Sequence, residues 1–280
     1  MTTGSVSKFS GLLLIGIITV AVFLVDGHAT KAISEDDKEE LVNYAFATWL
    51  GSGIYKSGAR RMAIVRMPLR YTLRIPEEAK PGIKFLMPVT LGYYDYKNSD
   101  VDFGTGSFVP GVEVAFSLNE YWTLKPFGQF GVGKDTSDGN LVYIYGGGIR
   151  SLVSIPYKKF KFGIGNSLIL ADERDGNGDI GDNFNMFEAG LDIQHPLGIS
   201  FRGRKLDGGV YFVISRFLSR YELEEPDDNS RKLKTLVEIG FTIAPDEPID
   251  IWKVSLERIG IDFRFGDHFA GIGMNMGFPF

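Results

Sequence analysis

The chain contains no cysteine, only three histidines and no excess of basic residues. The absence of cysteine excludes disulfides, thiolate metal sites and the N-terminal lipidation found in lipoproteins. A formal net charge of -5 argues against nucleic acid as a partner, because nucleic-acid binding draws on a surplus of lysine and arginine. No long apolar run follows residue 25.

Glycine and aromatic residues, by contrast, are plentiful. The 280 residues include 35 glycines, 13% are aromatic, and the mean hydropathy is close to zero. A β-barrel of alternating strands has this composition, because only every second residue of each strand has to be apolar. The length corresponds to about two average domains, but β-barrels of this size commonly form one.

The first 29 residues have the pattern of a secretory signal peptide. Lys8 precedes an apolar run over residues 9–25, and the following Asp26-Gly27-His28-Ala29 has small residues at the two positions that a signal peptidase inspects. This pattern predicts export, with cleavage after Ala29 or, using Thr30 and Ala32, slightly later. The alternative is an uncleaved anchor, because the apolar run approaches the ~17 residues that can just span a bilayer.

Residues 30–44 form a polar lead-in to the predicted barrel. From Ser34 to Tyr44 the sequence carries helix-forming residues behind a serine that can cap a helix, with acids in the first turn. We therefore predict a short helix, which either plugs the barrel lumen or lies solvated in the periplasm.

Residues 45–280 show period-2 alternation, which predicts an all-β domain. One parity is apolar, and the other holds charges of both signs, as expected for a hydrated lumen. We predict a transmembrane up-and-down antiparallel β-barrel of about 12 strands. The predicted strands are 45–55, 62–74, 83–93, 112–118, 122–132, 141–153, 160–170, 187–193, 210–218, 237–243, 259–265 and 270–280.

An even number of strands places both termini on one side, which is the periplasm for an exported chain. The predicted external connections are 56–60, 97–106, 134–140, 171–183, 219–232 and 266–268. The predicted periplasmic turns include Asn119–Glu120 and 155–158, with longer ones at 74–82, 196–205 and 244–251. Prolines within the strands, at Pro68, Pro88, Pro110 and Pro126, require bulges or strand ends.

The chain ends in the strand-like run 270–280, one face of which is wholly apolar. Gly273, Met276, Phe278 and Phe280 resemble the terminal signal of bacterial outer-membrane barrels, which the insertion machinery reads. The alternative is the last core strand of a soluble sandwich, in which this run would be an aggregation-prone edge.

Together these features resemble the translocator barrel of autotransporters. The resemblance rests on the twelve strands, the preceding helix, the aromatic, apolar, Pro-aromatic pattern of Trp122 to Phe127, and Phe280. It implies the bacterial outer membrane as location, with outer-membrane lipid and the barrel-insertion machinery, acting on the C-terminal strand, as partners. Only about fifteen residues lie between the predicted signal peptide and the first predicted strand. We therefore expect a solitary monomeric barrel without a passenger, structural or translocator-like; a diffusion channel for small solutes is the alternative.

The polar parity supplies the candidate lumen residues. We expect opposite charges to pair across the lumen, although the basic residues could instead form a ladder for a substrate. The candidates are Arg66, Arg70, Lys84, Glu113, Lys125, Arg150, Glu188, Asp192 and Glu238.

No residue pattern predicts catalysis, a cofactor or a metal. His195 shares the apolar parity and is expected at the bilayer interface, while His268 and Asp267 are sequence neighbours whose side chains point to opposite faces of a strand. No Gly-x-Ser-x-Gly motif is present. An outer-membrane hydrolase is therefore a third, less favoured function. The acids between Asp175 and Asp182 are spaced as in a calcium loop, but Ile180 stands where the loop needs glycine and the twelfth-position glutamate is missing.

Overall fold

The computed structural model describes residues 44–57, 60–77, 80–96, 103–135, 141–175, 183–223, 231–246, 249–251 and 254–280. All of them belong to one compact unit, Lys38–Phe280. The predicted signal peptide, residues 30–43 of the predicted lead-in, and Asn177, Asp179 and Asp182 of the acidic loop lie outside these ranges.

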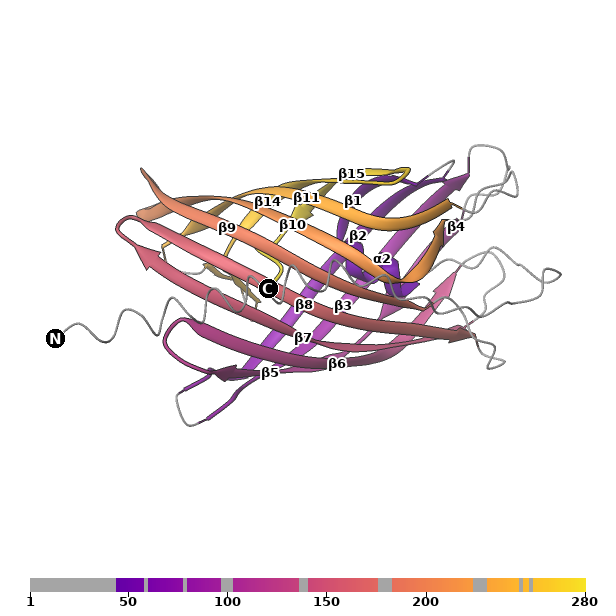
Figure 1. Ribbon diagram of the computed structural model, residues 1–280, viewed down its shortest axis with the longest axis horizontal. Helices are drawn as coiled ribbons and strands as arrows, with labels where there is room; N and C mark the ends of the chain where they lie inside the picture. The colour runs from indigo at the N-terminus through magenta and orange to yellow at the C-terminus, as the bar shows by residue number, and fades with distance from the viewer. Residues whose placement is uncertain are drawn as a thin grey trace. The chain divides into compact units, whose positions relative to one another are not determined.

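The described chain folds into one short helix and antiparallel strands (Figure 1). The helix is α2 (Tyr44–Leu50). The strands are β1 (Ser52–Ser57), β2 (Arg60–Arg74), β3 (Gly82–Tyr96), β4 (Phe103–Phe108), β5 (Gly111–Ser117), β6 (Trp122–Asp135), β7 (Leu141–Tyr157), β8 (Phe160–Asp175), β9 (Phe184–Phe201), β10 (Arg204–Leu223), β11 (Arg231–Pro245), β12 (Ile249–Ile251), β13 (Val254–Leu256), β14 (Ile259–Gly266) and β15 (Phe269–Asn275).

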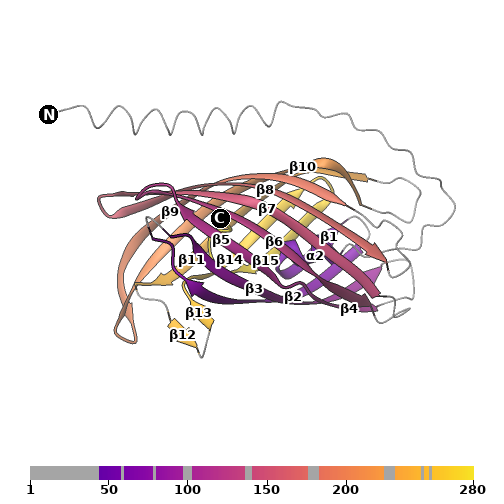
Figure 2. The same ribbon diagram turned by 90° about the horizontal axis from the view of Figure 1, so that it is seen from below.

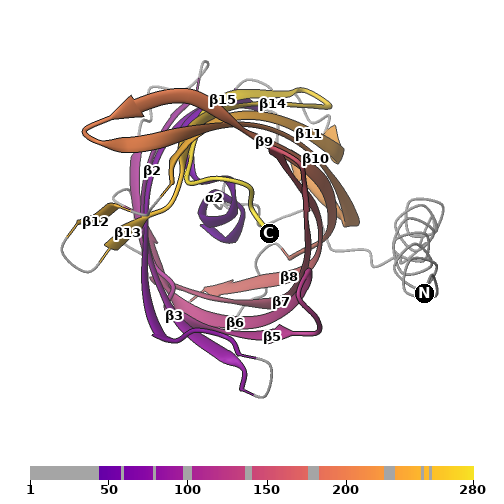
Figure 3. The ribbon, with the colours of Figure 1, turned by 90° about the vertical axis from the view of Figure 1, so that its left-hand side faces the viewer.

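The sheet closes on itself as a barrel (Figures 1 and 3). Each wall strand pairs with its sequence neighbours, as β2 does with β3. The pairing of the first strand, β1, with the last, β15, closes the ring. β4 and β5 both pair with β3 and β6, so they are two halves of one wall strand. The wall therefore has twelve strands, as the sequence predicted. β12 and β13 form a separate hairpin outside the ring (Figures 2 and 3).

The two faces of the wall differ in polarity. Large apolar side chains such as Val65, Phe130 and Met274 are exposed on the outer face, whereas Glu188 and Asp262 are buried on the inner face. Closing the sheet satisfies the backbone groups of strands that would otherwise form edges. The predicted alternation, apolar outward and charged inward, is confirmed.

The prolines lie where pairing on one side of their strand is interrupted, although Pro68, Pro88 and Pro126 are inside strands whose other side stays paired. Pro110 lies in the break between β4 and β5, and the Pro88 carbonyl accepts the Val109 N–H there at 3.3 Å. Pro68 lies beyond Ile64, the last β2 residue that pairs with β1, so its missing N–H breaks no ladder with β1. Pro126 falls in a gap of the β5–β6 pairing.

Several predicted connections have different lengths in the structure. The predicted long turn 196–205 is wrong, because β9 and β10 continue to a two-residue turn at Arg202 and Gly203. Both have positive φ, 50° and 82°, which matches the twist of a tight hairpin. β4 begins inside the predicted loop 97–106. Its small residues show no apolar alternation from which a strand could be predicted. The 244–251 connection contains β12.

The first predicted strand, 45–55, is wrong over its first half. Residues 44–50 form α2 inside the ring of strands, and only Ser52–Ser57 joins the wall (Figure 3). All α2 residues except Trp49 are buried. A segment enclosed in the lumen has no neighbouring strand, so it satisfies its backbone groups internally as a helix. The helix described in the lumen therefore covers residues 44–50, later than the predicted 34–44.

The last predicted strand, 270–280, is also wrong beyond residue 275. β15 ends at Asn275, Gly277 has φ +108°, and the chain turns into the lumen (Figure 3). Asn275 Oδ1 accepts the Gly277 N–H at 3.1 Å and holds this turn. Phe280 is consequently buried rather than facing outward. The apolar alternation predicts that these residues continue the wall, but they are buried inside the lumen instead.

Candidate functional site

The lumen is the candidate site. One end of the barrel holds the connections β2–β3, β5–β6, β7–β8, β9–β10 and β11–β14 and is here named the turn end; the opposite end is the loop end.

α2 fills one half of the lumen. Phe46 stacks on Trp49 with ring centroids 5.6 Å apart and approaches the rings of Phe217 and Phe269 at 6.0 and 6.2 Å. Leu50 is fully buried. Burying each such side chain stabilises the helix in the lumen by ~1.5–3 kcal/mol.

Wall residues hold both ends of α2. The Ala45 N–H donates to Glu173 Oε2 at 3.1 Å, near the loop end of β8. The Leu50 carbonyl accepts hydrogen bonds from the Tyr55 hydroxyl at 3.0 Å and from Arg264 Nη1. The terminal backbone groups of a helix lack partners within the helix, so these contacts replace water. The helix is therefore anchored to the wall as well as packed in it.

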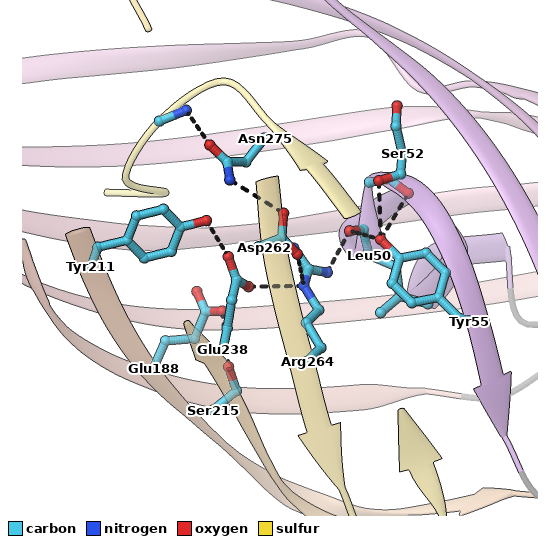
Figure 4. A network of polar contacts seen from close by, with 12 residues as sticks. Leu50, Ser52, Tyr55, Glu188, Tyr211, Ser215, Glu238, Asp262, Arg264 and Asn275 are labelled. Carbon is cyan, nitrogen blue, oxygen red and sulfur yellow. Dashed lines mark hydrogen bonds and ion pairs between the residues drawn. The ribbon is translucent and has the colours of Figure 1, made fainter. Parts of the chain in front are cut away.

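Arg264 is the centre of a buried charge network (Figure 4). Its Nε lies 2.9 Å from Glu238 Oε2 and 3.0 Å from Asp262 Oδ1. These contacts have ion-pair distances without hydrogen-bond geometry at Nε. The Tyr211 hydroxyl donates to Glu238 Oε1 at 2.5 Å. One arginine thus contacts two buried carboxylates, while its Nη1 binds the end of α2.

The other inner carboxylates of this side are satisfied locally. Glu188 accepts hydrogen bonds from Ser167 at 2.5 Å and Ser215 at 3.3 Å. Arg258 forms a two-point ion pair with Asp192, at 2.7 and 3.0 Å. Such fork-shaped pairs are the stronger kind of charge-assisted hydrogen bond.

The C-terminal tail, residues 276–280, occupies the turn half of the lumen. The rings of Phe278 and Phe280 lie 4.8 Å apart, and Phe278 packs on Tyr211 at 5.8 Å. Gly165 and Gly190 make room for them: a Cβ on Gly165 would lie 2.2 Å from the Phe280 ring. We name the wall around Gly165, Gly190 and Tyr211 the tail socket.

A cavity of about 820 Å³ lies within the lumen, bordered by α2 residues and by the tail. Its lining includes all nine residues predicted from the polar parity: Arg66, Arg70, Lys84, Glu113, Lys125, Arg150, Glu188, Asp192 and Glu238. Among them the structure pairs Arg150 Nη1 with Glu113 Oε2 at 2.9 Å. The strand parity placed these side chains; what they do remains a proposal.

Sequence reasoning missed the residues that organise this lumen. Arg258, Asp262 and Arg264 share the polar parity of the run 259–265, so the signal was present. Tyr211 was missed because an aromatic residue is expected outside. Which charges pair depends on the barrel curvature, which no single strand reveals.

Of the predicted membrane-insertion residues, Gly273 lies in β15 facing Asp262, whereas Met276, Phe278 and Phe280 lie in the tail. Their role in insertion stays a prediction.

The two histidines of the described ranges, His195 and His268, lie in separate places. His195 packs against Phe160 with ring centroids 4.6 Å apart, and His268 occupies the β14–β15 turn with φ 57°. Within the described ranges there is no group of three or more His, Cys, Asp or Glu side chains that could hold a metal ion. No helix in the described part of the chain is long and apolar enough to span a membrane. The expectation that the chain is not an enzyme remains a prediction.

Comparison with known proteins places this geometry. No family model matches the sequence, and no curated protein matches it. The β domain of the Bordetella autotransporter BrkA is similar in structure, with a TM-score of 0.52 and 11% identity over 80% of this chain and 92% of that one. The transport unit of the Escherichia coli autotransporter AIDA-I gives a TM-score of 0.46 and 12% identity over 81% and 88%. The chain is thus an all-β, twelve-stranded barrel whose fold is similar to that of the BrkA β domain.

Proposed function

We propose that the chain is an integral outer-membrane barrel of the translocator type whose lumen is closed by its own segments. The observation that carries the proposal is the outer face of the wall, where apolar side chains such as Val65, Leu191 and Ile261 are about half exposed. A soluble monomer rarely exposes contiguous apolar patches above a few hundred Å². In lipid, a closed barrel pairs its backbone groups within the wall and buries this apolar face against the acyl chains.

The occupied lumen supports a translocator-type barrel over an open diffusion channel. α2 is packed and hydrogen-bonded in one half, and Phe278 and Phe280 fill the tail socket in the other. A solute or a further polypeptide could pass only after these segments move. The diffusion channel remains the second candidate, because the remaining cavity is large and its lining is charged.

The finer part of the proposal is that the barrel acts as a monomer and that its termini face the periplasm. It would enter the membrane through the barrel-insertion machinery and contact outer-membrane lipid along its outer face. The support for this orientation is that the three hairpins at Asn119–Glu120, Lys158–Lys159 and Arg202–Gly203 share the turn end. Outer-membrane barrels have short turns on the periplasmic side.

Epitope tags test location and orientation together. A tag inserted in residues 176–182 or 224–230 should be reached by antibody on intact cells, because these connections belong to the loop end. A tag between Lys158 and Lys159 should be reached only after the outer membrane is opened. All tagged chains should fractionate with outer membranes and migrate faster unheated than boiled. A reversed pattern contradicts the orientation, and a tagged product in the soluble periplasmic fraction contradicts the membrane location.

A further inference from the structure

Cations predominate on one side of the cavity, where Glu113 is the acidic exception, while the carboxylates on the other side lie beside Arg258 and Arg264. Five cations come from β2, β3, β6 and β7, on neighbouring parts of the wall. We name them the cationic wall: Arg66, Arg70, Lys84, Lys125 and Arg150. The carboxylates Glu188, Asp192, Glu238 and Asp262 come from β9, β11 and β14. A cavity with one charged side is electrically polarised even where its total charge is small.

These carboxylates are hydrogen-bonded or ion-paired mainly on their own side of the cavity, and of the cationic wall Arg150 attracts Glu188 electrostatically. Glu188 accepts from Ser167 and Ser215, and Asp192 is bound by Arg258. The remaining two carboxylates share Arg264.

The cationic wall, in contrast, has too few partners. Glu113 lies opposite Lys84 in the β3–β5 register, but its carboxylate is bonded to Arg150. Lys125 is attracted electrostatically by Glu113 and, more weakly, by the exposed Glu257, but it is repelled by Lys84 and Arg150. Within the described part of the chain, Arg70, Lys84 and Lys125 have no ion pair within 4.0 Å.

Arg66 shows the deficit most clearly. Its Nε is buried and has no hydrogen-bond partner among the described residues. It lies in the repulsive field of Arg150, Arg70 and Arg264. The Arg66 side chain is half-buried, and a buried Nε–H without an acceptor is costly. A bound anion would offset the repulsion among the arginines and accept from this donor.

We propose that the cationic wall is a binding site for a small, multiply charged oxyanion of the phosphate class. The cavity, about 820 Å³, has the volume of small-ligand sites and holds such an anion with water. Arginine and lysine donors match phosphate oxygens, which accept several charge-assisted hydrogen bonds at once. The cavity lining extends to the exposed residues Asp246 and Glu257 towards the turn end, so the cavity meets solvent there.

Calorimetry on the full-length chain, refolded in neutral detergent, tests the site with inorganic pyrophosphate as the probe. We expect saturable binding of one pyrophosphate per barrel, which weakens as sodium chloride is raised. The double variant Arg66→Gln, Lys84→Gln should bind about tenfold more weakly or worse, because two charge-assisted contacts are lost. Arg66→Lys, which keeps the charge but loses the fork, should retain part of the affinity.

The matched control removes two positive charges outside the cavity, with Lys134→Gln and Lys234→Gln. Both lysines are exposed, and neither borders the cavity. This variant should bind as the unmodified chain does. Equal weakening in the control, or no saturable heat with the unmodified chain, overturns the site. Folding of each variant is checked by its faster unheated migration; if the double variant does not fold, Lys84→Gln and Lys125→Gln, made singly, carry the test. A folded, inserted barrel that does not bind pyrophosphate contradicts this inference and leaves the proposed function standing.

Discussion

Replacing Arg264 by glutamine is expected to lower the free energy of unfolding by about 3–5 kcal/mol, because it leaves two buried carboxylates without their cation. Arg264 lies within 3.0 Å of Glu238 and Asp262 and also donates to the Leu50 carbonyl. The variant therefore loses both charge balance in the wall and the anchor of α2. The measurement is the urea concentration at half-unfolding in detergent, followed by the unheated gel mobility.

A second substitution shows whether charge balance is the cause. Adding Glu238→Gln to the variant removes one of the unpaired carboxylates, so it should recover part of the lost stability. Arg174→Gln is the control, since its side chain is exposed and donates to the Tyr145 hydroxyl. It should cost less than about 0.5 kcal/mol. An Arg264 variant as stable as this control would show that the network does not hold the lumen together.

Adding a methyl group at Gly165 is expected to drive the C-terminal tail from its socket. The new Cβ of Gly165→Ala would lie 2.2 Å from the Phe280 ring and 2.7 Å from its Cβ, at the base of the side chain, so Phe280 has to leave its position. We expect a loss of about 2–4 kcal/mol, the order of exposing a buried phenylalanine. The freed tail should also become a substrate for carboxypeptidase, which mass spectrometry detects.

Gly128→Ala is the matched control, because no atom lies within 4 Å of its added Cβ. It should leave both stability and tail protection unchanged. Combining Gly165→Ala with Phe280→Ala should cost no more than Phe280→Ala alone, because the clash partner has gone. A Gly165→Ala chain whose tail resists carboxypeptidase as well as the control contradicts the socket.

The same substitution separates two roles of the terminal phenylalanine. Gly165→Ala leaves the terminal sequence intact for the insertion machinery, whereas Phe280→Asp changes it. Lower insertion in cells with Phe280→Asp alone would support the predicted signal. Equal loss with both variants would assign the effect to the socket, which an aspartate also cannot fill.

The sequence predicted the wall well because strand parity is a local property. In β14, Ile259, Ile261 and Phe265 alternate with charged residues, and the structure places the two sets on opposite faces. The even strand number and the hairpin at Asn119 were recoverable for the same reason. The interruption of the wall strand between β4 and β5 was also predictable, because Pro110 lies there and has no N–H for the ladder.

The contents of the lumen were not predictable in this way. Residues 45–50 are mostly apolar, so their pattern fits a buried helix as well as a strand. The helix forms because no neighbouring strand of the described chain is available inside the lumen. The tail continues the alternation of β15, yet Gly277 and the socket around Gly165 draw it inward. Both outcomes depend on contacts between residues more than a hundred positions apart, which local periodicity does not contain.

Planar-bilayer recording tests most directly whether the lumen is closed by its own segments. The intact refolded chain is compared with one in which the seven residues of α2 are replaced by a glycine-serine linker of equal length and residues 278–280 are removed. We predict small, brief openings from the intact chain and larger, steady conductance from the altered one, with single changes in between. Steady conductance from the intact chain, equal to that of the altered chain, would contradict the closed barrel and favour the diffusion channel.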